Sequence, residues 1–354
     1  MGFALAATVS LAACATTVNA EGTANTAAPV LVPRPSQSPR VDLMAKFELD
    51  PEAANDHWQE RGSLEDPWGG DINPGYEAPN DAATGAFALP TDGLGPILGE
   101  DGVGLGDDDS GGLAPQTGMN HGTTGRLYLS HDNTWHRYGV CSATVVSSAT
   151  HDIIATAGHC VWDTENGGLM EHMIFIPGDE GNAEVAPYGT WTAAEVFLRT
   201  EFSDGAFSGD DGVWGEGWAY DYAFVRLAPN SEGAKIQDVV GAQGIAFGVP
   251  TETLVVIGYP TAAPFDGRSE RFCAASSWFR YQMGGYSIDC TMTPGCSGGG
   301  WFTRWDPDRG AGYLVGVSST GDSWSLNANA LGSAALELYE YAGAVNDGLF
   351  EGGG

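Results

Sequence analysis

Basic residues are scarce in this sequence, and lysine is almost missing. The 354 residues include 14 Lys and Arg against 46 Asp and Glu, which gives a formal net charge of -32 at pH 7. Lys46 and Lys235 are the only lysines. A field of this sign repels phosphate backbones, so we exclude nucleic acid as a partner. We interpret the acidity as a solubility feature suited to saline surroundings, and not as a mark of the substrate.

The start of the chain lacks an apolar run long enough to span a bilayer. Residues 1–20 are apolar but too short, no stop-transfer pattern follows, and together they predict an export signal without the usual positively charged start. Leu11–Cys14 resembles a bacterial lipobox, which would make Cys14 a lipidated membrane tether, and Val18–Ala20 is the alternative cleavage site. With either processing site, we expect a protein outside the cytoplasm, where disulfides form. It would be secreted, periplasmic or lipid-anchored at the cell envelope.

Residues 21–122 lack sustained hydrophobic alternation. They are rich in Pro, Gly, Asn, Asp and Ala, and such a composition buries too little apolar surface to offset its ordering entropy. We therefore expect a largely irregular acidic segment. It is either a propeptide or stalk, or a disordered linker with no function of its own. The acidic run Asp101–Asp109 fits no calcium-loop spacing and the histidines show no zinc spacing, so no metal site is predicted.

Helical periodicity is missing from most of the remaining chain. Short apolar runs recur between turn signals from Thr124 onward, among them D-I-I-A-T-A, H-M-I-F-I and T-L-V-V-I-G-Y. With 52 Gly, 19 Pro and 42% hydrophobic residues, this pattern predicts an all-β sandwich or barrel with real cores. One helical segment, Ala334–Tyr341, precedes a Gly-rich tail.

Three stretches carry residue types suited to acyl transfer by serine. T-A-G-H-C ends an apolar run with His159, D-Y-A-F-V-R-L opens with Asp221, and P-G-C-S-G-G-G places Ser297 among glycines. A serine nucleophile needs an imidazole base and a buried carboxylate that orients the imidazole. It also needs N–H donors for the oxyanion, which Gly295 and Ser297 would supply from a glycine-rich turn.

The choice of carboxylate rests on the sequence that follows it. Asp221 precedes an apolar alternating run that would bury it beside the core. Asp210 and Asp211 are the alternatives.

These blocks resemble the three signature blocks of the chymotrypsin-like (trypsin-fold) serine peptidases, and their order of His, Asp and Ser is the order of that fold. The forms T-G-R-L-Y-L and C-T-M-T-P-G-C-S-G-G are similar to bacterial trypsin-like and glutamyl-endopeptidase-type members. The resemblance covers about residues 123–342. It implies two antiparallel six-stranded β-barrels, over 123–235 and 236–342, followed by the tail 343–354.

The resemblance also implies an activity. A serine endopeptidase would act on protein or peptide substrates with His159, Asp221 and Ser297 as catalytic residues, and it would need no cofactor. We expect a monomer. The alternatives are an esterase that uses the same triad, and a catalytically silent binding protein of the same fold, although no member of the triad is missing.

Two positions depart from the family's serine block. Cys296 replaces an aspartate and Gly300 replaces a proline. In digestive members that aspartate pairs with a new N-terminal ammonium, and Cys296 has no charge for such a pair, so activation by N-terminal insertion is not expected. If 21–122 inhibits, we expect it to cover the cleft and a 123–354 fragment to be active. A Cys296 nucleophile is the rival interpretation.

Cysteine pairing follows partly from the family. Cys141 and Cys160 match the family's bridge beside the histidine. Cys273 and Cys290 would close a hairpin and are the favoured second pair, which leaves Cys296 as a buried thiol. Other pairings among the last three cysteines stay open.

The specificity pocket of this family is lined by residues just before the serine and by the strand after it. Here these are Thr291–Thr293 and Val317–Gly321. None is acidic, which argues against Arg or Lys in the pocket, and the later strand has no histidine of the kind that glutamyl endopeptidases carry. We expect Thr291, Ser318 and Ser319 to contact a small or medium apolar side chain, and Ser318 also to support Asp221.

Overall fold

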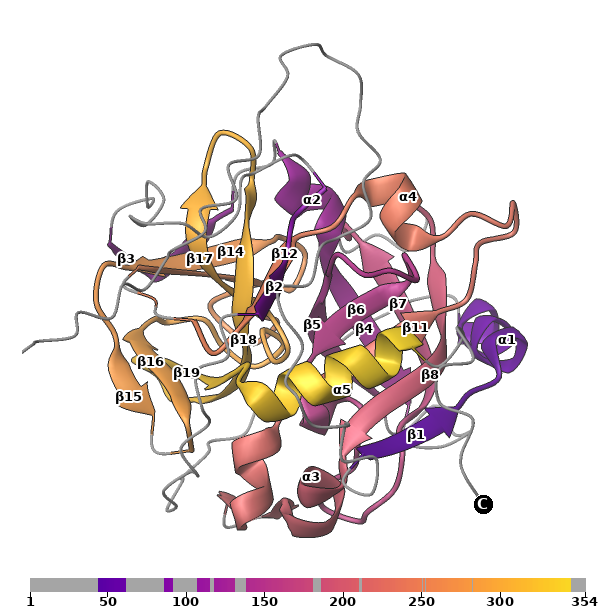
Figure 1. Ribbon diagram of the computed structural model, residues 1–354, viewed down its shortest axis with the longest axis horizontal. Helices are drawn as coiled ribbons and strands as arrows, with labels where there is room; N and C mark the ends of the chain where they lie inside the picture. The colour runs from indigo at the N-terminus through magenta and orange to yellow at the C-terminus, as the bar shows by residue number, and fades with distance from the viewer. Residues whose placement is uncertain are drawn as a thin grey trace, which may run out of the picture.

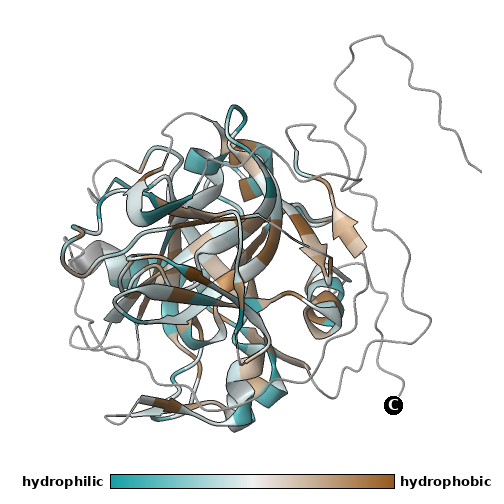
Figure 2. Ribbon diagram, turned by 90° about the vertical axis from the view of Figure 1, so that its left-hand side faces the viewer, coloured by the Kyte–Doolittle hydropathy of each residue, from teal (hydrophilic) through white to brown (hydrophobic). Residues whose placement is uncertain are grey.

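The computed structural model shows two β-sheets side by side, with the last helix lying across both (Figure 1). It describes residues 44–61, 86–91, 107–114, 118–130, 138–180, 186–209, 212–249, 251, 253–281 and 283–344. The predicted export signal and Cys14 lie outside these ranges. Hydrophobic residues run along the strands, while hydrophilic residues gather in the surrounding turns (Figure 2).

The first sheet is a closed six-stranded barrel with a seventh strand added outside. Its strands follow the order β1-β8-β11-β6-β5-β4-β7, and β7 pairs back onto β8 to close the ring. The strands are β1 (Met44–Glu48), β4 (Thr124–Ser130), β5 (Tyr138–Val145), β6 (Ile153–Thr156), β7 (Glu171–Pro177), β8 (Trp191–Arg199) and β11 (Ala223–Leu227). Their inward apolar side chains, such as Leu127, Phe175 and Val196, form one buried core.

The second sheet stays open as a half-barrel. Its main path is β15-β16-β19-β18-β17-β13-β14-β3, with β12 parallel to β18 and β2 beside β12. The strands are β2 (Ala86–Ala88), β3 (Asp108–Leu113), β12 (Gly244–Phe247), β13 (Leu254–Gly258), β14 (Arg271–Ala275), β15 (Phe279–Tyr281), β16 (Gly285–Asp289), β17 (Gly300–Asp306), β18 (Ala311–Gly321) and β19 (Ser325–Ala330). The free edge of β14 pairs with β3, which is why β14 and β16 do not close the expected second six-stranded barrel.

The described parts of the segment before residue 122 form more regular structure than the composition predicts. β1 pairs with β8, β2 with β12 and β3 with β14. Helix α1 (Pro51–Arg61) packs on β7 and β8 and buries Trp58 against Tyr128 and Tyr138. Strands as short as β2, or as polar as D-D-S-G-G-L in β3, bind through their backbones, so the hydrophobic pattern does not reveal them.

The other helices are short, apart from the last. They are α2 (Met119–Thr123), α3 (Thr200–Gly205), α4 (Ile236–Val240) and α5 (Ser333–Ala344), with 3-10 turns η2 (Gly158–Cys160) and η3 (Glu216–Tyr220) and a hairpin of β9 (Phe207–Gly209) and β10 (Gly212–Trp214). The predicted C-terminal helix is confirmed, and Leu336 and Tyr339 of α5 are buried in the core beneath it. Within the described ranges, no helix combines the length and the apolar character needed to cross a membrane.

Candidate active site

His159 and Asp221 meet because the strands that carry them are paired. η2 places His159 just after β6, and η3 ends just before Asp221 and β11. β6 and β11 run antiparallel, with Thr156 opposite Ala223, so the end of one strand lies beside the start of the other. His159 Nδ1 lies 2.8 Å from Asp221 Oδ2, and the His159 backbone N–H donates to Oδ1 at 2.8 Å. Because a carboxylate only accepts, Nδ1 carries a proton, and in the neutral imidazole Nε2 is then the nitrogen with the lone pair.

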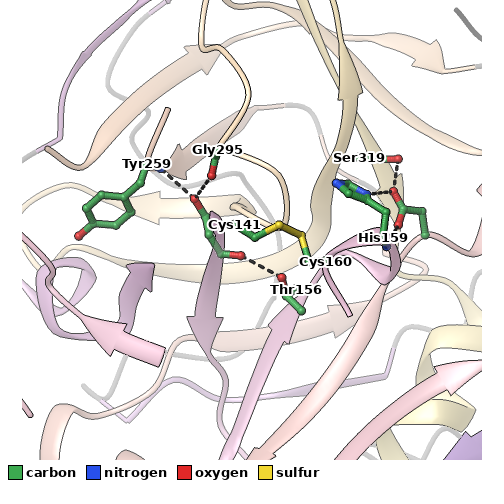
Figure 3. Close-up of a disulfide and its surroundings, with 9 residues drawn as sticks. Cys141, Thr156, His159, Cys160, Tyr259, Gly295 and Ser319 are labelled. Carbon is green, nitrogen blue, oxygen red and sulfur yellow. Dashed lines mark hydrogen bonds and ion pairs between the residues drawn. A yellow bond between two sulfur atoms is a disulfide. The ribbon is translucent and has the colours of Figure 1, made fainter. Parts of the chain in front are cut away.

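Asp221 is held by further donors in a dry environment. Its side chain is 0% exposed, and Ser319 Oγ donates to Oδ2 at 2.5 Å. Figure 3 shows His159 and Ser319 reaching the same carboxylate from different elements. These donors give both oxygens of the buried side chain a hydrogen-bond partner. The alternatives Asp210 and Asp211 lie outside the described residues.

Ser319, and not Ser318, supports Asp221, so the expectation for Ser318 is wrong. Ser318 Oγ instead accepts a hydrogen bond from Trp301 Nε1 at 2.9 Å. Successive side chains of a strand point to opposite faces, which separates the two serines. Both residues are buried. Thr291, the third predicted substrate contact, is half-buried, and its N–H donates to Asp109 O of β3 at 2.8 Å.

Ser297 lies in a turn before β17 that is fastened to the first sheet. Ser142 N–H donates to Ser297 O at 2.7 Å. Gly298 has φ +77°, and a Cβ there would come within 2.2 Å of Thr156 Oγ1 and 2.4 Å of Ser142 O. Only glycine therefore allows this approach. Since Thr156 is three residues before His159, the serine turn and the imidazole are brought to the same edge of the barrel.

The backbone around Ser297 offers unused donors. Gly295 has φ +98°, and its carbonyl accepts from Ser142 Oγ at 2.9 Å (Figure 3). Among acceptors in the described part of the chain, none bonds the N–H groups of Gly295 or Ser297. The oxyanion hole at Gly295 and Ser297 stays a prediction, and it would use these two N–H groups.

Ser297 and His159 are both accessible but are not joined. Ser297 is half-buried and the His159 side chain is 20% exposed. Over the described ranges, no hydrogen bond links Ser297 Oγ to His159 Nε2; the imidazole bonds through Nδ1 to Asp221. Nucleophile–base bonds are often long in the substrate-free state and shorten when substrate binds.

The cysteines form the two expected pairs. Cys141–Cys160 ties β5 to the turn of His159, and Cys273–Cys290 links β14 to the end of β16 across the open side of the second sheet. Cys296 is a buried free thiol, and burial raises its pKa to about 12. A thiol in that state supplies almost no thiolate at neutral pH, which argues against Cys296 as a nucleophile.

One group of potential metal ligands surrounds the histidine. Cys141, His159 and Cys160 have ligand atoms within 4.8 Å of one another. Both sulfurs are bonded to each other, and metals bind the thiolate rather than a disulfide. The grouping therefore reflects the bridge beside the histidine.

Two residues near His159 and Asp221 were not predicted from the sequence. Trp218 packs its ring 5.8 Å from the His159 ring, and Asn329 Nδ2 donates to Trp218 O at 2.7 Å. The tryptophan three positions before Asp221 was a usable signal. Asn329, 108 positions further along the chain than Asp221, left none, because its contact depends on how the two sheets pack.

This combination of a closed barrel, a half-barrel and a buried aspartate bonded to a half-buried histidine, with a serine in a glycine-rich turn, defines a trypsin-like peptidase fold. The family model described as trypsin-like peptidase domain matches residues 141–317, which is half of the chain. The chain therefore belongs to the trypsin-like peptidase family, a family of serine endopeptidases.

Individual relatives agree with this family. The glutamyl endopeptidase of Bacillus licheniformis is 26% identical over 125 residues, which cover 34% of this chain and 33% of the relative. The chain thus matches about a third of that protein's length. The predicted resemblance to this branch is confirmed.

Solved structures agree as well. The thermostable serine protease AL20 from an extremophilic microorganism is 29% identical, with a TM-score of 0.52 over 64% of this chain and 100% of its own. Protease Anisep from Arthrobacter nicotinovorans is 28% identical, with a TM-score of 0.54 over 64% and 97%. The predicted fold class is confirmed.

Proposed function

We propose that the protein is an exported serine endopeptidase that hydrolyses peptide bonds through Ser297, His159 and Asp221. The observation that carries this proposal is the buried Asp221 carboxylate bonded to His159 Nδ1. It fixes the tautomer in which Nε2 can accept a proton, and this is the requirement for activating a serine.

In the proposed reaction, Ser297 Oγ attacks the scissile carbonyl carbon while its proton passes to His159 Nε2. The carbonyl oxygen becomes an oxyanion that accepts hydrogen bonds from the N–H groups of Gly295 and Ser297. The C–N bond then breaks, the amine leaves with the proton from His159, and an acyl-enzyme remains. Water, deprotonated by His159, attacks the ester carbon, the carbon–Oγ bond breaks, and Ser297 regains its proton.

The proposed substrate is a protein or peptide with a small or medium apolar residue before the scissile bond. The residues expected to line the pocket contain no acidic group, and the strand after the serine contains no histidine. Met292 is buried between flanking threonines, so the wall before the serine is neutral.

The proposed location is outside the cytoplasm. Two disulfides form in the structure, and such bonds persist in oxidising compartments. The proposed tether at Cys14 and the monomeric state rest on sequence alone.

A tagged fluorophosphonate tests the proposal, because it labels only an activated serine. Residues 21–354 should react, while Ser297→Ala and His159→Ala should not. Cys296→Ala, which keeps the nucleophile, is the matched control and should still react. If the folded 21–354 protein and the folded 123–354 fragment both stay unlabelled, the proposal is contradicted. Peptide and ester substrates with the same acyl part then distinguish an endopeptidase from an esterase.

A further inference from the structure

Asn329 reaches from the second sheet to the segment that carries Asp221. It belongs to β19, its side chain is fully buried, and its Nδ2 donates to the carbonyl oxygen of Trp218 at 2.7 Å. Trp218 lies in η3, three residues before Asp221. The amide therefore fixes the backbone that leads into the carboxylate.

Trp218 is itself the side chain that packs on His159. The two ring centroids lie 5.8 Å apart at an interplanar angle of 37°. Phe202 contacts the indole edge-on at 5.7 Å, and the indole Nε1 donates to Phe207 O at 2.9 Å. With Asn329 on its carbonyl, Trp218 is held at several points, and its ring keeps solvent from one side of the imidazole.

Stability does not explain why an asparagine occupies this position. Asn329 Oδ1 is buried and has no hydrogen-bond partner among the described residues. A buried unsatisfied carbonyl destabilises a fold, and asparagine is disfavoured inside strands. An apolar residue of similar size would remove both penalties but would leave the Trp218 carbonyl without this donor, so the contribution of Asn329 lies in the bond that it donates.

We infer that Asn329 is a positioning residue. Together with Ser319, it reaches from the second sheet and holds His159 and Asp221 in their mutual orientation. The two residues lie on neighbouring strands, β19 and β18. Ser319 binds the carboxylate itself and Asn329 binds the turn before it. The orientation of the imidazole thus depends on the packing between the two sheets. This inference rests on the proposed peptidase function.

The test compares Asn329→Leu with the unmodified 21–354 protein. Leucine has a similar size and removes the unpaired Oδ1, but it donates no hydrogen bond, so the Trp218 carbonyl loses its donor. These two effects oppose each other, and we expect the melting temperature to change by a few degrees at most. We expect kcat per fluorophosphonate-titrated site to fall about tenfold or more, with KM within about twofold, because the lost interaction serves the transition state. The far-downfield proton signal of His159 Nδ1–H should broaden or disappear in NMR spectra.

Val315→Ala is the matched control. It opens a cavity in the core of the second sheet without touching η3, so it should lower the melting temperature and leave kcat and the proton signal unchanged.

An Asn329→Leu protein with normal kcat and an intact proton signal would overturn the inference. If neither the unmodified protein nor the 123–354 fragment reacts with fluorophosphonate, the proposed function falls, yet the proton signal still decides whether Asn329 positions the pair.

Discussion

At the scale of single residues, the Asp221 carboxylate depends on donors from distant parts of the chain. Ser319 Oγ supplies one of them at 2.5 Å, and hydrogen bonds to charged groups are worth about 1.5–3 kcal/mol. We expect Ser319→Ala to lower kcat about tenfold or more and to change KM little, as measured by steady-state peptide hydrolysis. Ser276→Ala is the control, since Ser276 also donates to a carboxylate, that of Asp107, on the surface. Equal kcat values for the two variants would contradict the prediction.

Glu270 makes stability depend on pH. Burial raises its pKa from 4.5 to about 8, although Asn120 donates to the carboxylate. Between these values the folded protein binds a proton that the unfolded chain has released, so the free energy of unfolding falls as pH rises from about 4.5 to 8. The effect is about 1.4 kcal/mol per pKa unit, a few kcal/mol in total.

Glu270→Gln should remove that component of the pH dependence. The variant should gain stability relative to the unmodified protein at pH 8, and the difference should shrink towards pH 5, as measured by urea unfolding at each pH. The comparison cancels the contribution of the other acidic groups. A constant difference across this range would show that Glu270 does not titrate there.

The three residues of the proposed triad could be selected from the sequence because each stands in a local motif whose neighbours carry the information. His159 follows an apolar run, Asp221 opens one, and Ser297 lies among glycines that the turn requires. The role of Ser319 was not predictable, because the two adjacent serines look alike in the sequence and only the fold shows which of them faces Asp221.

At the scale of elements, the N-terminal strands act as covers for sheet edges. β3 occupies the edge of β14, and its Asp109 carbonyl accepts from Thr291 N–H beside the predicted pocket. Exposed edges invite pairing with other chains, so covering them protects the fold. The sequence could not show this, because backbone pairing leaves no periodic pattern in a strand such as D-D-S-G-G-L.

Gly111 of β3 tests this contact. It has φ +65°, and a Cβ would lie 2.6 Å from Phe265 and 3.3 Å from Met292. We expect Gly111→Ala to lower the free energy of unfolding by about 1–3 kcal/mol and to raise KM, since β3 would press on the pocket wall. Gly167→Ala has a similar φ of +74° with nothing within 4 Å, so it should reproduce the strain without the change in KM. An unchanged KM in Gly111→Ala would show that β3 does not influence substrate binding in the predicted pocket.

At the scale of the whole molecule, residues 44–61, 86–91 and 107–114 belong to the folded domain. Lys46 Nζ lies 2.7 Å from Glu195 Oε1, the Phe47 ring lies 5.8 Å from that of Trp162, and Trp58 is buried under α1. The N-terminal segment thus contacts both sheets. This arrangement changes what we expect of the 123–354 fragment, which loses β1, β2 and β3 together.

We expect 123–354 to melt about 10 °C or more below 21–354, because several kcal/mol of edge pairing and burial are lost. The informative comparison is a full-length protein with a specific cleavage site inserted between residues 61 and 86. After cutting, its pieces should co-elute in gel filtration and retain the fluorophosphonate labelling of the uncut protein, since β1 and α1 stay bound without a covalent link. If the cut pieces separate and the remainder labels faster, the segment is an inhibitor that must leave. If 123–354 melts at the same temperature as 21–354, the N-terminal strands do not contribute to the stability of the fold.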